Sequence, residues 1–316
     1  MENKPKSQTF KYEHSWSIPQ TLDKLIEALR ESWDISISTS GSTGAPKEIL
    51  LPASAMIFSA RNANEFLGAK PGDRWSLLLS PEHTAGLNVL VRSIELGTLP
   101  VTENESAEFT AIVPTQLFRA LNGDAKLLKH LQGCKAVLVG GAAAEVDLLA
   151  KAKAAGINCI TTYGMTETSG GCIYDGTPLP GVEVRIGETI ELKGPMLARV
   201  ELIDGFFVTS DLGKFEDGKL IVLGRADDVI NSGGKKVSLS KVEMALGESF
   251  AAFGTQNSEW GAALNIATTS QMSDEEIQLV LSVKFGVKAL QIYRVSEIPR
   301  TALEKIDRQA LGRLAK

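Results

Sequence analysis

A strand–helix–strand pattern near the middle of the chain is the feature that most restricts its fold. Residues 136–139 (AVLV) form a short apolar run typical of a buried strand. Residues 144–155 (AEVDLLAKAKAA) have the composition of a helix ended by Gly156, and residues 157–163 (INCITTY) indicate a second strand. Strands that alternate with helices favour a parallel sheet covered by helices on both faces. We therefore predict an α/β fold.

The same alternation extends toward the N-terminus. The spacing of apolar residues predicts helices at 19–31, 53–67 and about 86–96, and strands at 35–39 and 75–79. The pattern changes in residues 182–223, where short strand-like segments are separated by turn signals. These residues predict a small, mainly antiparallel β region.

The last ninety residues have a compact α+β pattern, with a capping box at Ser273 and Glu276 that begins a helix ending near Phe285. A chain of 316 residues also exceeds the usual size of a single core. We expect a large N-terminal domain at 1–226 and a small α+β domain at 227–316.

Charge and composition exclude several classes of protein. The net charge of −5 and the scattered Lys and Arg residues argue against binding to nucleic acid or to a membrane surface. No stretch approaches the roughly 20 apolar residues of a membrane span, and the polar N-terminus lacks a signal-peptide pattern. Three cysteines without a CxxC pair favour a reducing, cytoplasmic location over a disulfide framework or a structural zinc site. They are Cys134, Cys159 and Cys172.

A glycine-rich loop follows the strand at 35–39. In residues 38–48 (STSGSTGAPKE), glycines allow a tight turn that presents N–H groups to a phosphate, while hydroxyl groups and Lys47 add donors and charge. Pro46 occupies a position where the Walker motif requires glycine, so a Walker-type NTPase is disfavoured. On this loop alone, an ordinary surface turn is the alternative.

Four further motifs follow the loop along the chain. They are residues 163–167 (YGMTE), 209–213 (TSDLG), 224–234 (GRADDVINSGG) and 299–308 (PRTALEKIDR). Together and in this order, the five segments resemble those of the adenylate-forming superfamily, which includes acyl-CoA synthetases, adenylation domains of peptide synthetases and luciferases. Ser210 and Glu304 each replace a glycine of the family pattern. The resemblance implies a truncated adenylate-forming fold: a large N-terminal domain with a mostly parallel sheet and a small β region, then a small α+β domain.

The resemblance also implies residue roles. It makes Glu167 a Mg²⁺ ligand, which suits a hard cation that shares its oxygen ligands with phosphates, and makes Thr166 a donor to the α-phosphate. Without the surrounding motif, Glu167 reads as an ordinary solvated carboxylate. The residues implied to bind ATP are Ser40, Gly41, Ser42, Thr43, Gly44, Lys47, Gly141, Ala142, Tyr163, Asp211 and Arg225.

The last two motifs imply a catalytic lysine and a second substrate. By resemblance, Lys305 bridges the attacking carboxylate and the α-phosphate, where charge grows in the transition state. Asp227 matches the family hinge, about which the C-terminal domain rotates to exchange Lys305 for Gly233 and Gly234 beside the thiol tunnel. Glycines suit close passage of a thin thiol arm, so the expected second substrate is CoA.

The shortness of the chain before the phosphate loop, about forty residues, narrows the resemblance. A comparably shortened form, with similar TSGSTGAPKEI and HTAGLNVLVRSIELG segments, occurs among o-succinylbenzoate–CoA ligases of menaquinone biosynthesis. The resemblance then implies a dicarboxylate substrate, with His83, Arg92 and Ser169 as hypothetical anchors. A structural role for His83 and a solvent-facing Arg92 are the alternatives.

Three functions stay open on the sequence. The favoured one is an AMP-forming carboxylate–CoA ligase. The second adenylates another aryl or acyl acid and loads a carrier protein. The third is a non-catalytic nucleotide-binding relic, against which the joint presence of Lys47, Glu167, Asp211, Arg225 and Lys305 argues. A homodimer is left open as well.

Overall fold

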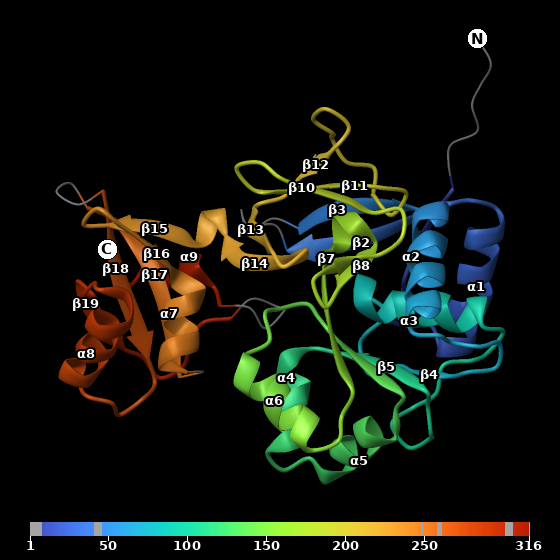
Figure 1. The fold of residues 1–316 in the computed structure, drawn as a ribbon, viewed down its shortest axis with the longest axis horizontal. Coiled ribbons are helices and arrows are strands. Elements are labelled where there is room, and N and C mark those ends of the chain that lie inside the picture. The colour runs from blue at the N-terminus through green and yellow to red at the C-terminus, as the bar shows by residue number, and fades with distance from the viewer. Residues whose placement is uncertain (1–7, 41–45, 248, 258–260, 301–305, 316) are drawn as a thin grey trace. The chain divides into compact units, whose positions relative to one another are not determined.

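The computed structural model describes residues 8–40, 46–247, 249–257, 261–300 and 306–315. It has the expected α/β fold and divides into two compact units (Figure 1). Unit 1 comprises residues 1–185, 191–208 and 215–220, and unit 2 comprises residues 186–190, 209–214 and 221–316. The main segment of unit 2 thus begins at Ile221, and a mobile domain that begins at residue 227 stays a prediction. No helix in the described ranges is long and apolar enough to cross a bilayer.

The central sheet of unit 1 has six strands in the order β4-β5-β6-β7-β8-β9. They are β4 (Trp75–Ser76), β5 (Phe109–Ile112), β6 (Ala136–Val139), β7 (Cys159–Met165), β8 (Gly170–Tyr174) and β9 (Thr177–Pro178). The first four are parallel, and β8 and β9 continue the sheet in antiparallel pairing. The predicted parallel sheet is confirmed. The strand expected at 75–79 ends at Ser76, because Leu77 already bonds to the carbonyl of Val101 outside the sheet.

Helices cover both faces of this sheet, as the alternation along β6 shows. Ala136 and Leu138 pack with Ala63 of α2 (Ala53–Phe66) and Val89 of α3 (Thr84–Glu95). The opposite face, with Val137 and Val139, packs against three further helices. These helices are α4 (Pro114–Leu121), α5 (Ala125–Gly133) and α6 (Val146–Ala154).

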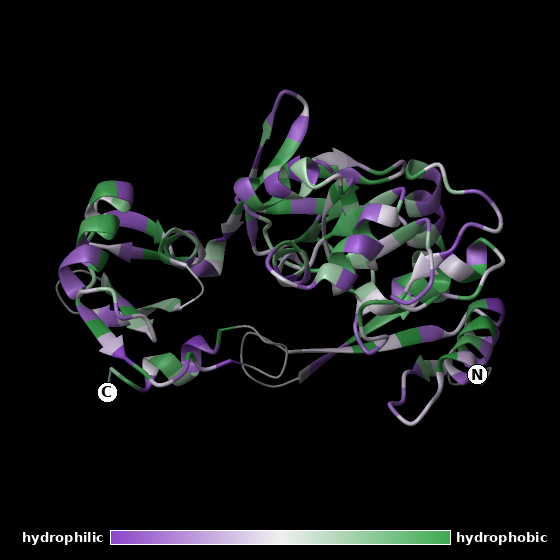
Figure 2. Cartoon of the chain, turned by 90° about the horizontal axis from the view of Figure 1, so that it is seen from below, coloured by the Kyte–Doolittle hydropathy of each residue, from purple (hydrophilic) through white to green (hydrophobic). Residues whose placement is uncertain are grey.

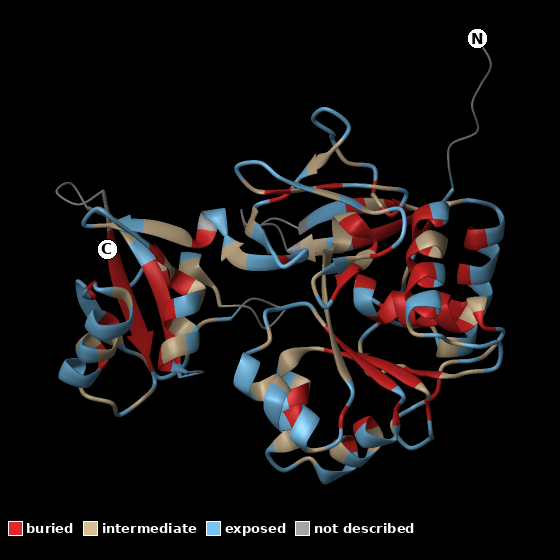
Figure 3. Ribbon diagram, in the orientation of Figure 1, coloured by how far each residue is buried: buried red, intermediate tan, exposed pale blue. Residues whose placement is uncertain are grey.

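A second sheet of unit 1 lies on the other side of α2 and α3. It consists of β1 (Thr9–Lys11), β2 (Asp34–Ser40) and β3 (Pro46–Pro52), and α1 (Ile18–Arg30) packs against β1, α2 and α3. Apolar residues of β2, β3 and α1 form one core with Met56 of α2 and Leu87 of α3. Since α2 and α3 face apolar cores on two sides, they are among the most buried helices (Figure 3).

Short strands follow β9 in the chain, where the pattern of residues 182–223 predicts a small β region. They are β10 (Glu183–Ile186), β11 (Ile190–Lys193), β12 (Phe207–Val208), β13 (Asp211–Glu216) and β14 (Lys219–Arg225). The first three form one small sheet in which β11 and β12 are antiparallel, and β13 pairs with β14.

Unit 2 has a sheet in the order β16-β15-β18-β17, with β19 beside β18. The strands are β15 (Val229–Ser232), β16 (Lys235–Ser238), β17 (Phe250–Asn257), β18 (Gly261–Thr268) and β19 (Gln291–Arg294); the helices are η2 (Ala226–Asp228), α7 (Leu239–Leu246), α8 (Asp274–Phe285) and α9 (Arg308–Gly312). The predicted capping box of α8 is confirmed: Ser273 bonds to the N–H of Glu276, and Gly286 ends the helix at φ 66°. Hydrophobic and hydrophilic residues interleave along the helices (Figure 2).

Candidate active site

The YGMTE motif lies at the carboxyl end of β7, where ligands bind in parallel α/β sheets. The chain turns through the one-turn helix η1 (Thr166–Thr168) and returns as β8. A Cβ atom on Gly164 would lie 2.0 Å from the carbonyl oxygen of Gly170, and Gly170 itself has φ +90°. The turn therefore requires glycine at both positions. We call residues 163–170 the motif loop.

Side chains of helices α2 and α3 form hydrogen bonds to the motif loop. The carbonyl of Ser169 accepts from Ser59 Oγ at 2.9 Å and from Asn88 Nδ2 at 2.8 Å. The hydroxyl groups of Thr84 and Thr166 lie 3.1 Å apart. Sequence reasoning did not identify Ser59, Thr84 and Asn88, because their burial in α2 and α3 is visible only in the fold.

Glu167 is half-buried, and its carbonyl accepts from the N–H of Ala198 at 2.8 Å. Within the described part of the chain, no donor contacts its carboxylate, and no three His, Cys, Asp or Glu residues gather as a metal site. A single carboxylate fits Mg²⁺, which commonly takes one or two carboxylates and completes its shell with phosphates and water.

The end of the predicted phosphate loop lies beside the motif loop. Lys47 is an exposed residue of β3, and β3 contacts η1. The N–H of Arg199 bonds to the carbonyl of Leu50 in β3 at 2.9 Å. The preceding residue, Ala198, bonds to the carbonyl of Glu167, so one segment contacts both β3 and the motif loop. Lys47 and Glu167 thus belong to one region of unit 1. Ser40 ends β2, and Gly41, Ser42, Thr43 and Gly44 lie outside the described residues.

The segment predicted to line the adenine pocket follows β6, the strand next to the motif strand. A Cβ atom on Gly140 would lie 2.3 Å from Thr162 Oγ1, so this residue packs directly against β7. Gly141 has φ +81° and Ala142 is exposed. The chain around Gly141 and Ala142 is therefore adjacent to Tyr163 at the same sheet edge.

Unit 2 carries the other predicted nucleotide contacts. Asp211 begins β13 and Arg225 ends β14, and the N–H of Ala226 bonds to the carbonyl of Ser210 at 2.7 Å, which holds these two positions close. Gly233 and Gly234 form the two-residue turn between β15 and β16, with φ 60° and 81°. Asp227 lies in η2, and Lys305 lies outside the described residues.

The three hypothetical acyl anchors are differently placed. His83 is the N-cap residue of α3 beside Thr84, whereas Arg92 lies nine residues later, about 13 Å along the helix axis. Ser169 is fully buried, and its hydroxyl donates to the carbonyl of Met196 at 2.8 Å, so it already has a structural partner.

Arg92 is buried, with 4% of its surface exposed. Its guanidinium lies 4.8 Å from the centre of the Trp75 ring, and Nη2 donates to the hydroxyl of Tyr174 at 3.2 Å. Nε has no partner among the described residues, nor does any described carboxylate pair with it. A solvent-facing Arg92 is therefore excluded. Its guanidinium is a buried cation that no described carboxylate pairs with.

Comparison with known proteins identifies the family of this chain. The family model for "AMP-binding enzyme" matches residues 35–195. The "Probable 2-succinylbenzoate–CoA ligase" of Mycobacterium tuberculosis is 37% identical, with 94% of this chain and 90% of that protein covered.

Solved structures agree with the fold. An o-succinylbenzoate CoA synthetase (MenE) of Bacillus subtilis, in complex with the acyl-adenylate intermediate OSB-AMP, is 24% identical with a TM-score of 0.77, over 88% of this chain and 68% of that one. An Escherichia coli MenE variant with bound OSB-AMS is 25% identical, with a TM-score of 0.73 over 89% and 68%. The extent of the family match and the identity to the mycobacterial protein together show that this chain belongs to the family of AMP-binding enzymes.

Proposed function

We propose that this protein is an AMP-forming 2-succinylbenzoate–CoA ligase that acts in menaquinone biosynthesis. The observation that carries the proposal is the braced motif loop, which holds Thr166 and Glu167 next to the strand that bears Lys47. The relative from Mycobacterium tuberculosis, matched over nearly its whole length, supports the same reaction and substrate.

The reaction has two balanced steps. A carboxylate oxygen of the succinyl group attacks the α-phosphorus of ATP, the bond to the bridging oxygen breaks, and pyrophosphate leaves with its electron pair. The thiol of CoA then attacks the acyl carbon, loses its proton, and displaces AMP to leave the thioester. Positioned charge is the main requirement of the first step, because negative charge accumulates around the α-phosphate.

The residues assigned to this step lie in both units. In unit 1, Lys47 contacts the departing phosphates and Thr166 donates to the α-phosphate. Glu167 would hold Mg²⁺, which neutralises triphosphate charge.

In unit 2, Asp211 accepts from the ribose hydroxyls and Arg225 adds a second ribose contact. Lys305 stabilises the growing charge, and Gly233 and Gly234 leave room for the thiol arm in the second step. Asp227 is the hinge that exchanges these two elements.

Arg92 supplies the cation for the second carboxylate of the substrate. Burial of an unpaired charge is unfavourable, and an anionic ligand removes that penalty. We therefore expect Arg92→Met to raise the KM for 2-succinylbenzoate by about 30-fold while kcat falls less, since the contact is present in both ground and transition states. The matched control is 4-oxo-4-phenylbutanoate, which keeps the succinyl carboxylate but lacks the aromatic one, and its KM should be unchanged by the substitution.

A pyrophosphate-release assay tests the reaction. ATP, MgCl₂ and one acid at a time, chosen from 2-succinylbenzoate, benzoate, acetate and a fatty acid, should give pyrophosphate only with the dicarboxylate. Thioester formation is then followed with CoA and, separately, with a phosphopantetheinylated carrier protein. Transfer to the carrier protein alone would contradict the ligase assignment, and an absence of pyrophosphate with every acid would contradict adenylation. Size-exclusion chromatography tests a homodimer.

A further inference from the structure

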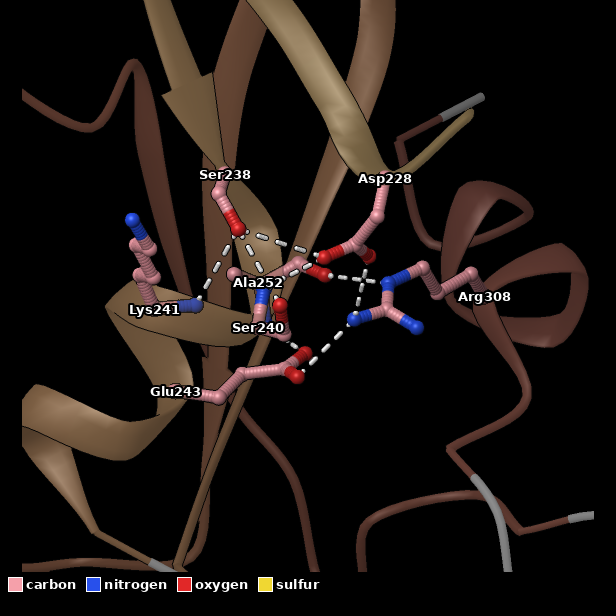
Figure 4. Close-up of polar contacts among 7 residues, drawn as sticks. All are labelled: Asp228, Ser238, Ser240, Lys241, Glu243, Ala252 and Arg308. Carbon is pink, nitrogen blue, oxygen red and sulfur yellow. Dashed lines mark hydrogen bonds and ion pairs between the residues drawn. The ribbon is translucent and has the colours of Figure 1, made fainter. Parts of the chain in front are cut away.

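Three charged side chains of unit 2 meet in one partly buried cluster (Figure 4). Nη2 of Arg308 lies 3.0 Å from Oδ1 of Asp228 and 2.8 Å from Oε2 of Glu243. The two carboxylates are 9% and 14% exposed, and the arginine side chain is 35% exposed. Figure 4 shows the guanidinium between the two carboxylates, which come from η2 and α7. We call these three residues the arginine cluster.

Backbone groups fix each carboxylate of the cluster. Oδ2 of Asp228 accepts from the N–H of Ser240 at 2.8 Å, and Oε1 of Glu243 accepts from the N–H of Ala252 at 2.9 Å. Nε of Arg308 donates to the carbonyl of Ala252 at 3.2 Å. The cluster therefore connects η2, α7, β17 and α9 by directed bonds, with one cation against two acids.

The position of the cluster along the chain relates it to the proposed mechanism. Asp228 directly follows the predicted hinge residue Asp227, and Arg308 lies three residues after Lys305. The chain on either side of residues 301–305 is held together: Arg300 and Ile306 form an antiparallel bridge, and the N–H of Asp307 bonds to the carbonyl of Pro299 at 2.8 Å.

We propose that Arg308 is a positioning residue: by binding Asp228 and Glu243 it fixes residues 306–308, which directly follow Lys305 in the sequence, relative to the proposed hinge. The inference rests on the proposed function. The chain after residue 227 and the chain after residue 305 then move as one body. Rotation of unit 2 about the proposed hinge therefore brings Lys305 to a defined position. A misplacement of about 1 Å can cost about 100-fold in rate, so such a link matters for the lysine-dependent step.

A purely structural role is the competing explanation. β17 is the edge strand of its sheet, and Glu243 and Arg308 bond both backbone groups of Ala252, as edge protection requires. Edge protection stabilises unit 2 as a whole and has no preference for one half-reaction. The two explanations therefore differ in which step a substitution affects.

The test measures both half-reactions separately for Arg308→Met. We expect pyrophosphate release to fall about 100-fold, while conversion of supplied 2-succinylbenzoyl-AMP and CoA to thioester falls less than about 3-fold. Arg308→Lys should restore adenylation only in part, because one ammonium group cannot reproduce the forked contacts. Arg294→Met is the matched control: Arg294 also bonds a carboxylate, that of Asp274, and a carbonyl, that of Ser270. It should leave both steps unchanged.

A double-mutant cycle with Lys305→Ala decides between the explanations. If Arg308 acts through Lys305, Arg308→Met causes no further loss of adenylation in the Lys305→Ala background. Equal loss of both half-reactions, or a full additional loss in that background, would overturn the proposal. Thermal unfolding of each variant, together with Glu243→Gln as a milder change in the same cluster, identifies variants that fail to fold.

A wild-type protein inactive in both half-reactions would refute the proposed function instead. If the wild type is active and Arg308→Met matches it, only the positioning role fails.

Discussion

The motif loop of unit 1 and the arginine cluster of unit 2 are both held by directed bonds, but of different kinds. Neutral hydroxyl and amide groups of α2 and α3 bond to the motif loop, and its residues Thr168 and Ser169 are fully buried. The arginine cluster is charged and partly exposed. Neutral buried bonds are insensitive to pH and salt, whereas charged ones respond to both.

This difference suggests a division of tasks. Under the proposed function, the motif loop binds metal and phosphate and must keep one geometry through the whole reaction, which a buried neutral network provides. Under the same proposal, unit 2 moves between the two steps and needs internal contacts that persist in water, and an ion cluster tolerates partial exposure. The predictions below test this comparison, from the largest expected effect to the smallest.

Removal of the predicted catalytic cation should have the largest effect. We expect Lys305→Ala to lower the rate of acyl-adenylate formation about 1,000-fold, because the transition state loses a donor to its growing charge. Thioester formation from supplied acyl-adenylate should be largely spared. Single-turnover measurement of each half-reaction checks this, and equal loss in both would contradict the role of Lys305.

A methyl group in the motif loop should destabilise the braced region of unit 1. In Gly164→Ala, the added Cβ meets the backbone carbonyl of Gly170 at 2.0 Å, and this backbone atom cannot move aside freely. We expect a loss of about 3 kcal/mol in the free energy of unfolding and loss of both half-reactions. Gly133→Ala is the control, because its Cβ meets no atom within 4 Å. Urea denaturation measures both, and a native-like Gly164→Ala would refute the tight turn.

The charged cluster should make stability depend on pH. Burial, opposed by Arg308 and the N–H of Ala252, raises the pKa of Glu243 from 4.5 to about 7. Between these values the folded protein binds more protons at Glu243 than the unfolded chain does. The free energy of unfolding contributed by this residue therefore falls as pH rises from about 4.5 to about 7.

Glu243→Gln removes this dependence, since glutamine does not titrate. We expect the difference in unfolding free energy between variant and wild type to shift in favour of the variant by about 1–3 kcal/mol across that window, at about 1.4 kcal/mol per pKa unit. Denaturation at pH 4.5, 6 and 7.5 measures it. A pH-independent difference would show that Glu243 titrates normally. The side chains that bond to the motif loop, Ser59 and Asn88, do not titrate, so they should contribute no pH dependence to the free energy of unfolding.

The smallest effect is expected from thiol modification. Burial raises the pKa of Cys134 and Cys172 to about 12 and that of Cys159 to about 11, so few thiolates exist at neutral pH. Treatment of the native protein with iodoacetamide should change adenylation less than about 2-fold. Mass spectrometry gives the extent of labelling, and rapid inactivation would contradict a packing role for these residues.

Much of the fold was predictable from local patterns. The apolar run at β6 and the capping box at Ser273 predict their elements correctly, because each depends on neighbouring residues only. The helices α4 and α5 were not predicted. The interpretation of 75–79 as a strand was too long, because an apolar run does not reveal where its partner strand ends. The sequence alone does not show whether Arg92 is exposed or buried. Its burial follows from the position of α3 between two apolar cores.

By itself, the sequence determined the order of the motifs, the alternation that gives a parallel sheet, and the family resemblance, since all three are encoded in residue type and spacing. Only the tertiary structure decided which distant residues meet. Asn88 reaches the carbonyl of Ser169, and Arg308 joins Asp228 to Glu243, across gaps of tens of residues. Such contacts depend on how the helices pack against the sheets, and no local pattern in the chain specifies that packing.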